Sequence, residues 1–168
     1  MIEKILRKSL IINLLLVFLI FVIDRVSKIY VIYLDKKFLG SEIYSSKFLN
    51  ISLIWNEGIA FGLLSFEKQS LYNILTLIIF IIILIIFFMI IKSSGLKKYA
   101  LLMILGGALG NVYDRIFYNA VPDFIDFHIG NFHWFIFNVS DIFISLGVLF
   151  LIFFELTNNQ KNNINEKN

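Results

Sequence analysis

The chain has 168 residues, of which 59% are hydrophobic and only 16% are charged, and its mean hydropathy is +0.85. An ordinary soluble domain is excluded, because such domains contain about 25% charged residues. The formal net charge is +3 and cysteine is absent, so neither a nucleic-acid partner nor thiol chemistry is expected.

Continuous apolar runs predict four membrane-spanning helices, because a span needs about 20 apolar residues and barrel strands would alternate instead. The first run follows a basic segment and resembles a signal peptide. It lacks a small-residue cleavage site, which favours an uncleaved first span. The predicted spans cover about residues 9–30, 71–91, 99–115 and 141–156.

The distribution of Lys and Arg predicts how the spans are oriented, since basic residues in short loops stay on the cytoplasmic side. Basic residues precede the first span and also lie between the second and third. Segment 35–68 balances its Lys residues with acids, and segment 116–138 has no Lys or Arg at all. Both termini are therefore expected in the cytoplasm, with these two segments outside. The Asn-rich tail 158–168 is expected to be disordered there.

The first outer segment also carries a β pattern. Residues Phe48 to Trp55 alternate in part between apolar and polar side chains, and the turn-forming sequence Asn56-Glu57-Gly58 follows them. Phe132 to Phe137 is a second strand-like stretch. We therefore expect an all-α membrane protein with four transmembrane helices and a small extracytoplasmic β element at about residues 40–66. Residues 1–157 form a single four-span domain in this interpretation.

Ionisable side chains at membrane depth are costly and require a partner or a function. Asp24 and Lys28 are four residues apart on the first span, which is the spacing of a structural ion pair. In the third span, Gly106 and Gly110 form a small-residue face for close helix packing. That face continues to Asn111 and Arg115, as the wall of a site would. Asp114 is interpreted as an interfacial acid beside Arg115.

Two further acids lie near the fourth span. Asn138 and Asp141 have the spacing of a reciprocal helix cap, which alone would explain this acid. Asp123 is flanked by apolar residues, which raise the pKa of a carboxyl group and so favour its protonated form. A protonated acid beside an ionised one is the arrangement that activates water in aspartic proteases. Five acids are predicted near the outer membrane face, and their spacing does not show which two would be catalytic. They are Asp24, Asp114, Asp123, Asp126 and Asp141.

Other schemes have weaker support. His128 and His133 lack a metal-binding spacing, so they are interpreted as surface or interfacial histidines and no metal is expected. Neither a Gly-x-Ser-x-Gly elbow nor a Gly-rich phosphate loop is present. Two rivals to a peptidase stay open. One is a small proton- or ion-coupled carrier, and the other is a structural membrane protein whose acids form caps and ion pairs.

Five motifs in order resemble those of the lipoprotein signal peptidase family, also called signal peptidase II. The resemblance extends from the first span to the fourth. The motifs are Asp24-x-x-Ser27-Lys28, Asn56-x-Gly58-x-Ala60-Phe61-Gly62, Gly106-Gly107-Ala108-Leu109-Gly110-Asn111-x-x-Asp114-Arg115, Val121-x-Asp123-Phe124 and Phe137-Asn138-x-x-Asp141. The sequence departs from the family pattern at Ser140, where Ala is usual, and at Pro122, where Val or Ile is commoner.

The resemblance implies an aspartic endopeptidase of the bacterial inner membrane that removes the signal peptide from diacylglyceryl-modified prolipoproteins. The family cuts just before the lipidated cysteine, and its site lies near the outer face. Asp123 and Asp141 are the catalytic pair by this resemblance. Prolipoproteins and membrane lipid are the expected partners, a monomer is expected, and no cofactor is required. The residues implied to line or support the site are Asp24, Lys28, Asn56, Gly58, Ala60, Asn111, Arg115 and Asn138.

Overall fold

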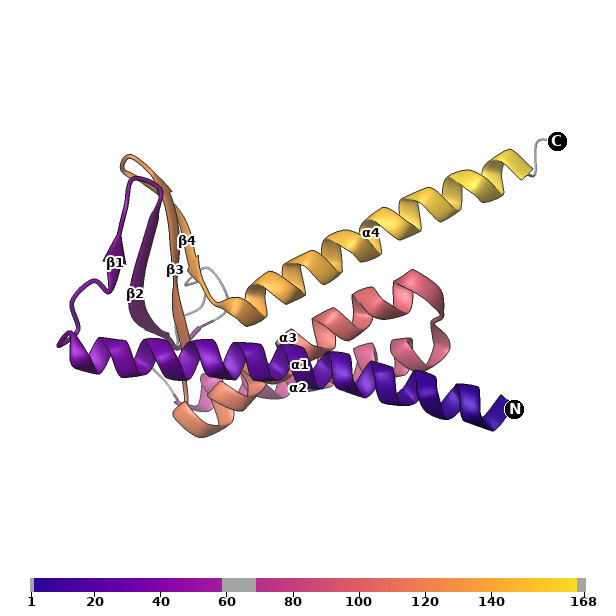
Figure 1. Ribbon diagram of the computed structural model, residues 1–168, viewed down its shortest axis with the longest axis horizontal. Coiled ribbons are helices and arrows are strands. Elements are labelled where there is room, and N and C mark those ends of the chain that lie inside the picture. Colours follow the sequence, from indigo (N-terminus) through magenta and orange to yellow (C-terminus); the bar gives the residue numbers. More distant parts are fainter. Residues whose placement is uncertain (1, 59–68, 166–168) are drawn as a thin grey trace.

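A computed structural model describes residues 2–58 and 69–165 of the chain (Figure 1). Helices and strands alternate in blocks, and one small sheet is built from segments far apart in the sequence. The elements in chain order are α1 (Ile2–Lys37), β1 (Tyr44–Ser45), β2 (Leu49–Asn56), α2 (Gln69–Lys92), α3 (Gly95–Tyr118), β3 (Val121–Ile129), β4 (Phe132–Phe137) and α4 (Val139–Asn165).

Four helices among the described residues are long and apolar enough to cross a membrane, which confirms the predicted fold class. Their apolar segments are Ser9–Lys37, Tyr72–Lys92, Gly95–Tyr118 and Val139–Thr157. The third segment is the least hydrophobic of the four. Nevertheless, 61% of its most apolar 18-residue stretch is buried inside the protein, against 22% or less of the corresponding stretch in each other helix. Helix α3 therefore lies at the centre of the bundle, and it contacts each of the other three helices. The other helices expose apolar side chains as a lipid-facing surface requires.

Glycines allow α3 to approach its neighbours closely. A Cβ atom at Gly106 would lie 2.9 Å from Cβ of Ile20 on α1, and one at Gly107 would lie 2.9 Å from Ile144 on α4. Both distances are shorter than the contacts that Cβ atoms make in proteins, so a side chain at either position would push the helices apart. The small-residue face predicted from the sequence is thus a packing surface for two helices.

The strands form one antiparallel sheet in the order β1-β2-β3-β4. Pairing of β2 with β3 places Ile54 opposite Asp123 and Asn56 opposite Val121. Figure 1 shows the sheet at one end of the helices and both chain termini at the other end. Because only Asn138 separates β4 from α4, the sheet passes directly into the fourth helix.

Strand β4 covers the predicted stretch Phe132 to Phe137, and β2 covers most of the other. Strand β3 was not predicted. It joins β4 through Gly130 and Asn131, with Gly130 at a φ of 59°. A Gly-Asn pair between two strand-like runs is a hairpin signal that would have revealed it.

Helices α1 and α4 extend furthest beyond their predicted spans. Helix α1 continues to Lys37, and α4 continues to Asn165, into the tail for which disorder was expected. Neither Gly nor Pro follows Gly147, so no backbone signal stops α4 earlier. Residues 166–168 lie outside the described part of the chain.

Candidate active site

Two carboxylates meet where the sheet passes into α4. Asp123 projects from β3 and is only 3% exposed, and Asp141 lies in the first turn of α4. Asn138 connects them. Its side-chain Nδ2 donates to Asp123 Oδ1 at 2.6 Å, and its backbone N–H donates to Asp141 Oδ2 at 3.1 Å. A single residue thus fixes both carboxylates.

Asn138 is also the N-cap of α4. The backbone N–H of Asp141 donates to Asn138 Oδ1 at 3.2 Å, and Asp141 accepts the N–H of Asn138 in return. This is the reciprocal capping arrangement that the spacing predicted. The cap and the meeting of the two acids are therefore features of the same group of atoms and do not exclude one another.

Asp123 is held in a setting that favours its neutral form. Burial raises the pKa of this carboxyl to about 6, and the negative charge of Asp141 adds to the increase. The hydrogen bonds that it accepts from Asn138 and from Asn56 Nδ2, at 2.8 Å, oppose the increase without cancelling it. Near neutral pH, Asp123 can therefore both hold and release a proton.

On its other side, Asp141 is linked to buried charges between α1 and α3. Asn111 Nδ2 donates to Asp141 Oδ1 at 2.8 Å, while Asn111 Oδ1 accepts from Lys28 Nζ at 2.8 Å. Lys28 is fully buried, and its ammonium group also contacts Asp24 at 3.0 Å and Asp114 at 2.7 Å. The orientation of the Asn111 amide is set by this ammonium, which can only donate.

Arg25 completes the cluster of buried charges. Its guanidinium contacts Asp24 at 3.0 Å and Asp114 at 2.7 Å. Two acids and two bases thus balance in formal charge, as buried ions require. Asp24 additionally accepts the backbone N–H of Ser140 at 3.0 Å, so an acid of α1 satisfies a free amide at the start of α4.

Arg115 holds the loop after β2 in place. Its Nη2 donates to the carbonyl of Gly58 at 3.0 Å, and the N–H of Gly58 donates to Asn56 Oδ1 at 2.8 Å. Asn56 in turn donates to Asp123. A contact chain therefore runs from the guanidinium on α3 through this loop to the carboxyl on β3.

An apolar cavity of about 580 Å³ lies beside Asp141, between the sheet and the first turns of α4. Aromatic and aliphatic side chains form most of its wall, and the carboxylate-bearing Asp141 also lines it. The cavity is suited to an apolar chain positioned against that carboxylate. Lining residues include Phe127, Trp134, Phe137, Ile142 and Leu146.

Comparison with known proteins identifies the family. A family model described as signal peptidase (SPase) II matches residues 16–157. The chain belongs to the signal peptidase II family. Its relatives include the lipoprotein signal peptidase of Pelagibacter ubique (strain HTCC1062), which is 48% identical over 166 residues covering 99% of each protein. The lipoprotein signal peptidase of Francisella tularensis subsp. novicida (strain U112) is 37% identical over 141 residues, covering 80% of this chain and 88% of the relative.

Solved structures agree with this assignment. Two structures described as a bacterial membrane enzyme match with TM-scores of 0.70 and 0.67, at 31% and 30% identity. They cover 89% and 86% of this chain, and the matches span 90% and 92% of those proteins. This signal peptidase II chain is therefore a multi-pass bacterial membrane peptidase. The family assignment gives no support to the carrier hypothesis.

The structure brings together nearly all the residues that the motifs of signal peptidase II select. Asp24, Lys28, Asn111, Asp141, Asn138, Asp123, Asn56, Gly58 and Arg115 form one connected series of hydrogen bonds and ion pairs. Ala60 lies outside the described residues. Of the five acids, Asp126 lies apart from this series, paired with His133.

The interpretation of Asp114 as an interfacial acid beside Arg115 was wrong. Asp114 is 0% exposed and pairs with Arg25 and Lys28 on α1. The error arose because Arg115 is adjacent in sequence, whereas a helix turns adjacent side chains about 100° apart. Arg25, the residue after Asp24, is a second basic side chain on α1, and its presence beside Asp24 and Lys28 was the available sign of a further ion pair with α3.

Proposed function

We propose that this chain removes signal peptides from lipoprotein precursors by aspartic hydrolysis, with Asp123 and Asp141 as the catalytic pair. The observation that supports the pair is the position of Asn138, which hydrogen-bonds both carboxylates, and Asp141 also lines an apolar cavity. The lipoprotein substrate follows from the family and from the names of the relatives.

In the proposed reaction, Asp141 acts as the general base. It accepts hydrogen bonds from Asn111 and from the Asn138 backbone at a helix N-terminus, and all of these features stabilise a carboxylate. It takes a proton from a water molecule whose oxygen attacks the scissile carbonyl carbon. Protonated Asp123, with its raised pKa, donates to the carbonyl oxygen.

The second half of the reaction returns both acids to their starting states. The tetrahedral diol collapses when Asp123 takes back its proton, and the C–N bond breaks as Asp141 gives its proton to the leaving amine. The pair acts as a unit, because each acid is needed in the protonation state opposite to that of its partner. No metal or covalent intermediate takes part in this scheme.

The substrate is proposed to be a precursor whose lipobox cysteine carries a diacylglyceryl group, with cleavage just before that cysteine. The apolar cavity beside Asp141 is suited to hold apolar parts of the substrate. Binding energy gained there, away from the scissile bond, helps to position the peptide against the two acids. The sheet and the site are proposed to face the outside of the inner membrane, with both termini in the cytoplasm.

The test is cleavage by the purified protein in detergent of a diacylglyceryl-modified precursor and of its unmodified counterpart. We expect cleavage of the modified form only. Asp123→Asn and Asp141→Asn should each abolish it, whereas Asp35→Asn, the same change at the far end of α1, should retain wild-type activity. Failure to cleave either precursor would contradict the function. Cleavage by both active-site variants would contradict the catalytic pair alone.

A further inference from the structure

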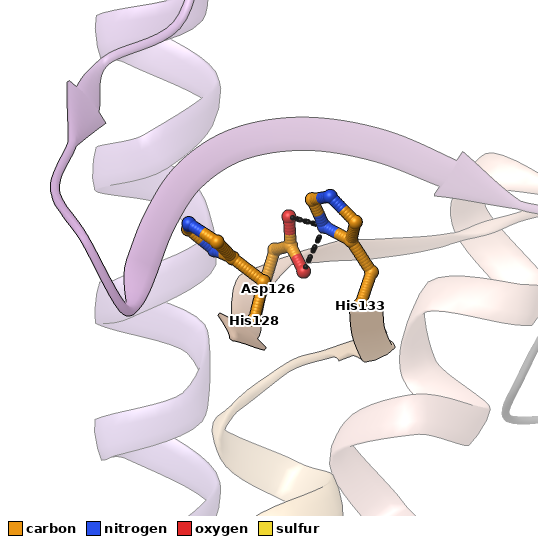
Figure 2. Close-up of side chains that lie close together, drawn as sticks. All are labelled: Asp126, His128 and His133. Carbon is orange, nitrogen blue, oxygen red and sulfur yellow. Dashed lines mark hydrogen bonds and ion pairs between the residues drawn. The ribbon is translucent and has the colours of Figure 1, made fainter. Parts of the chain in front are cut away.

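The hairpin of β3 and β4 carries a second group of polar side chains, apart from the two proposed catalytic acids. His128 and His133 are direct cross-strand partners, and Asp126 lies two residues before His128 on the same face of β3. Figure 2 shows the three side chains close together, with the carboxylate of Asp126 directed at the ring of His133. Strand pairing therefore brings these groups together even though their spacing in the sequence matches no metal motif.

The donor atoms are close enough to share an ion. One ligand atom from each residue lies within 4.8 Å of the others. His133 Nδ1 is 2.8 Å from Asp126 Oδ2. Ligand atoms around a tetrahedral zinc ion are about 3.3 Å apart, given bonds of about 2.0 Å. The group therefore needs to adjust by at most about 1.5 Å, and the side chain of His133, which is 52% exposed, has room for that adjustment.

An ion pair explains only part of this arrangement. The contact between Asp126 and His133 satisfies those two residues, but His128 Nδ1 is buried and has no hydrogen-bond partner within the described part of the chain. A buried polar nitrogen without a partner is costly. The rings of His128 and His133 are nearly parallel, 5.0 Å apart, so neither ring supplies a hydrogen bond to the other. An ion bound at the nitrogen edges of the two rings, where their lone pairs point, and beside the carboxylate would give all three residues a shared partner.

We propose that Asp126, His128 and His133 bind a divalent transition-metal ion of the zinc type. Two imidazoles and one carboxylate are ligands that Zn²⁺ accepts, and three protein ligands leave a fourth position for water. The ion would connect β3 to β4 across the hairpin. Since His128 also lines the apolar cavity beside Asp141, bound metal stiffens one wall of that cavity.

Binding of metal alone tests this proposal without any substrate. The full-length protein, purified in detergent and treated with a chelator, is titrated with ZnCl₂ by isothermal calorimetry, and its thermal unfolding is followed with and without zinc. We expect one zinc ion per chain and a higher Tm with zinc. His128→Asn and His133→Asn should each weaken binding at least about tenfold and remove the rise in Tm.

Two control variants locate the ion. Asp123→Asn should bind zinc as the wild type does, because it alters only the proposed catalytic pair. Glu155→Gln, which removes an exposed carboxylate from α4, should also leave binding unchanged. Loss of binding in Asp123→Asn would place zinc at the catalytic acids and overturn the proposal. So would unchanged affinity in either histidine variant, or absence of binding by the wild type.

Cobalt(II) provides a direct view of the ligands. Substituted into a tetrahedral site with nitrogen ligands, Co²⁺ absorbs visible light strongly, and both histidine variants should lose that absorption. The Tm of each variant measured without metal shows that it is folded. A wild-type cobalt spectrum typical of the hydrated ion alone would contradict coordination by the hairpin.

Discussion

The side-chain amide of Asn138 lies 2.6 Å from a carboxylate oxygen of Asp123, while the same residue caps the helix that carries Asp141. A helix cap and an active-site contact are thus combined in one side chain. The two roles use different atoms, because Oδ1 accepts from the helix and Nδ2 donates to Asp123. Substitutions that keep one atom type and lose the other will therefore separate stability from activity.

Asn138→Ser should reduce activity while preserving the fold. A serine hydroxyl is a good N-cap but is too short to replace the amide that contacts Asp123. We expect kcat/KM to fall about 10²-fold, the scale of a misplaced catalytic group, with little change in Tm. Asn138→Ala should lose the same activity and, in addition, about 1 kcal/mol of stability. Equal Tm losses in both variants would show that the cap does not act through Oδ1.

The raised pKa of Asp123 predicts how activity depends on pH. If Asp123 donates a proton in the reaction, kcat/KM should fall as the pH rises above about 6, because this parameter reports the free enzyme. The measurement is the rate of precursor cleavage at limiting substrate between pH 4.5 and 8, in buffers of constant ionic strength. A flat profile across that range would contradict the assignment of Asp123 as the acid.

The free energy of unfolding should also depend on the ionisation of Asp123, and it should fall as the pH rises. The pKa of Asp123 is higher in the folded protein, about 6, than the ordinary 3.8, so the folded state binds more protons between these values. Stability from this group is complete below pH 3.8 and is lost as the pH rises through 6, by up to about 3 kcal/mol. The Tm difference between Asp123→Asn and the wild type should therefore widen in favour of the variant from pH 4 to pH 7.

Local and distant features of this site differ in how far the sequence predicts them. The spans follow from hydropathy, and the Asn138–Asp141 cap follows from a spacing of three residues, so both were predictable. Asp114 was misinterpreted because its partner Arg25 is 89 positions away in the sequence. The pair forms between α1 and α3, which pack closely at Gly106 and Gly110. The metal-ligand geometry of His128 and His133 likewise depends on strand register, which spacing along one strand does not reveal.

Lys28 should contribute strongly to the stability of the folded protein, because its ammonium group has three buried partners. Its ammonium contacts Asp24, Asp114 and Asn111, so Lys28→Met leaves acids buried without this partner. Breaking a buried ion pair from one side costs about 3 to 5 kcal/mol. We expect a large drop in Tm for Lys28→Met and partial recovery in Lys28→Met combined with Asp114→Asn. An additive loss in the double variant would contradict the contact between Lys28 and Asp114.

The tight packing around Gly110 predicts that substitutions of Gly110 and Ser140 have coupled effects on Tm. A Cβ atom at Gly110 would overlap Ser140 Oγ and crowd the carboxylate of Asp24. That hydroxyl is buried and has no hydrogen-bond partner among the residues that the structure describes, so Ser140→Ala should leave the Tm unchanged or raise it. Gly110→Ala should lower the Tm, since the serine and the buried ions cannot move away.

The double variant Gly110→Ala with Ser140→Ala removes one of the two clashes while the one with Asp24 remains. Its Tm should lie between those of Gly110→Ala and the wild type. Ser140→Ala keeps the backbone N–H that donates to Asp24, so the link from α1 to the start of α4 is preserved in every member of this series. A purely additive effect of the two substitutions on Tm would show that α3 and α4 approach each other less closely at Gly110 than the contact with Ser140 requires.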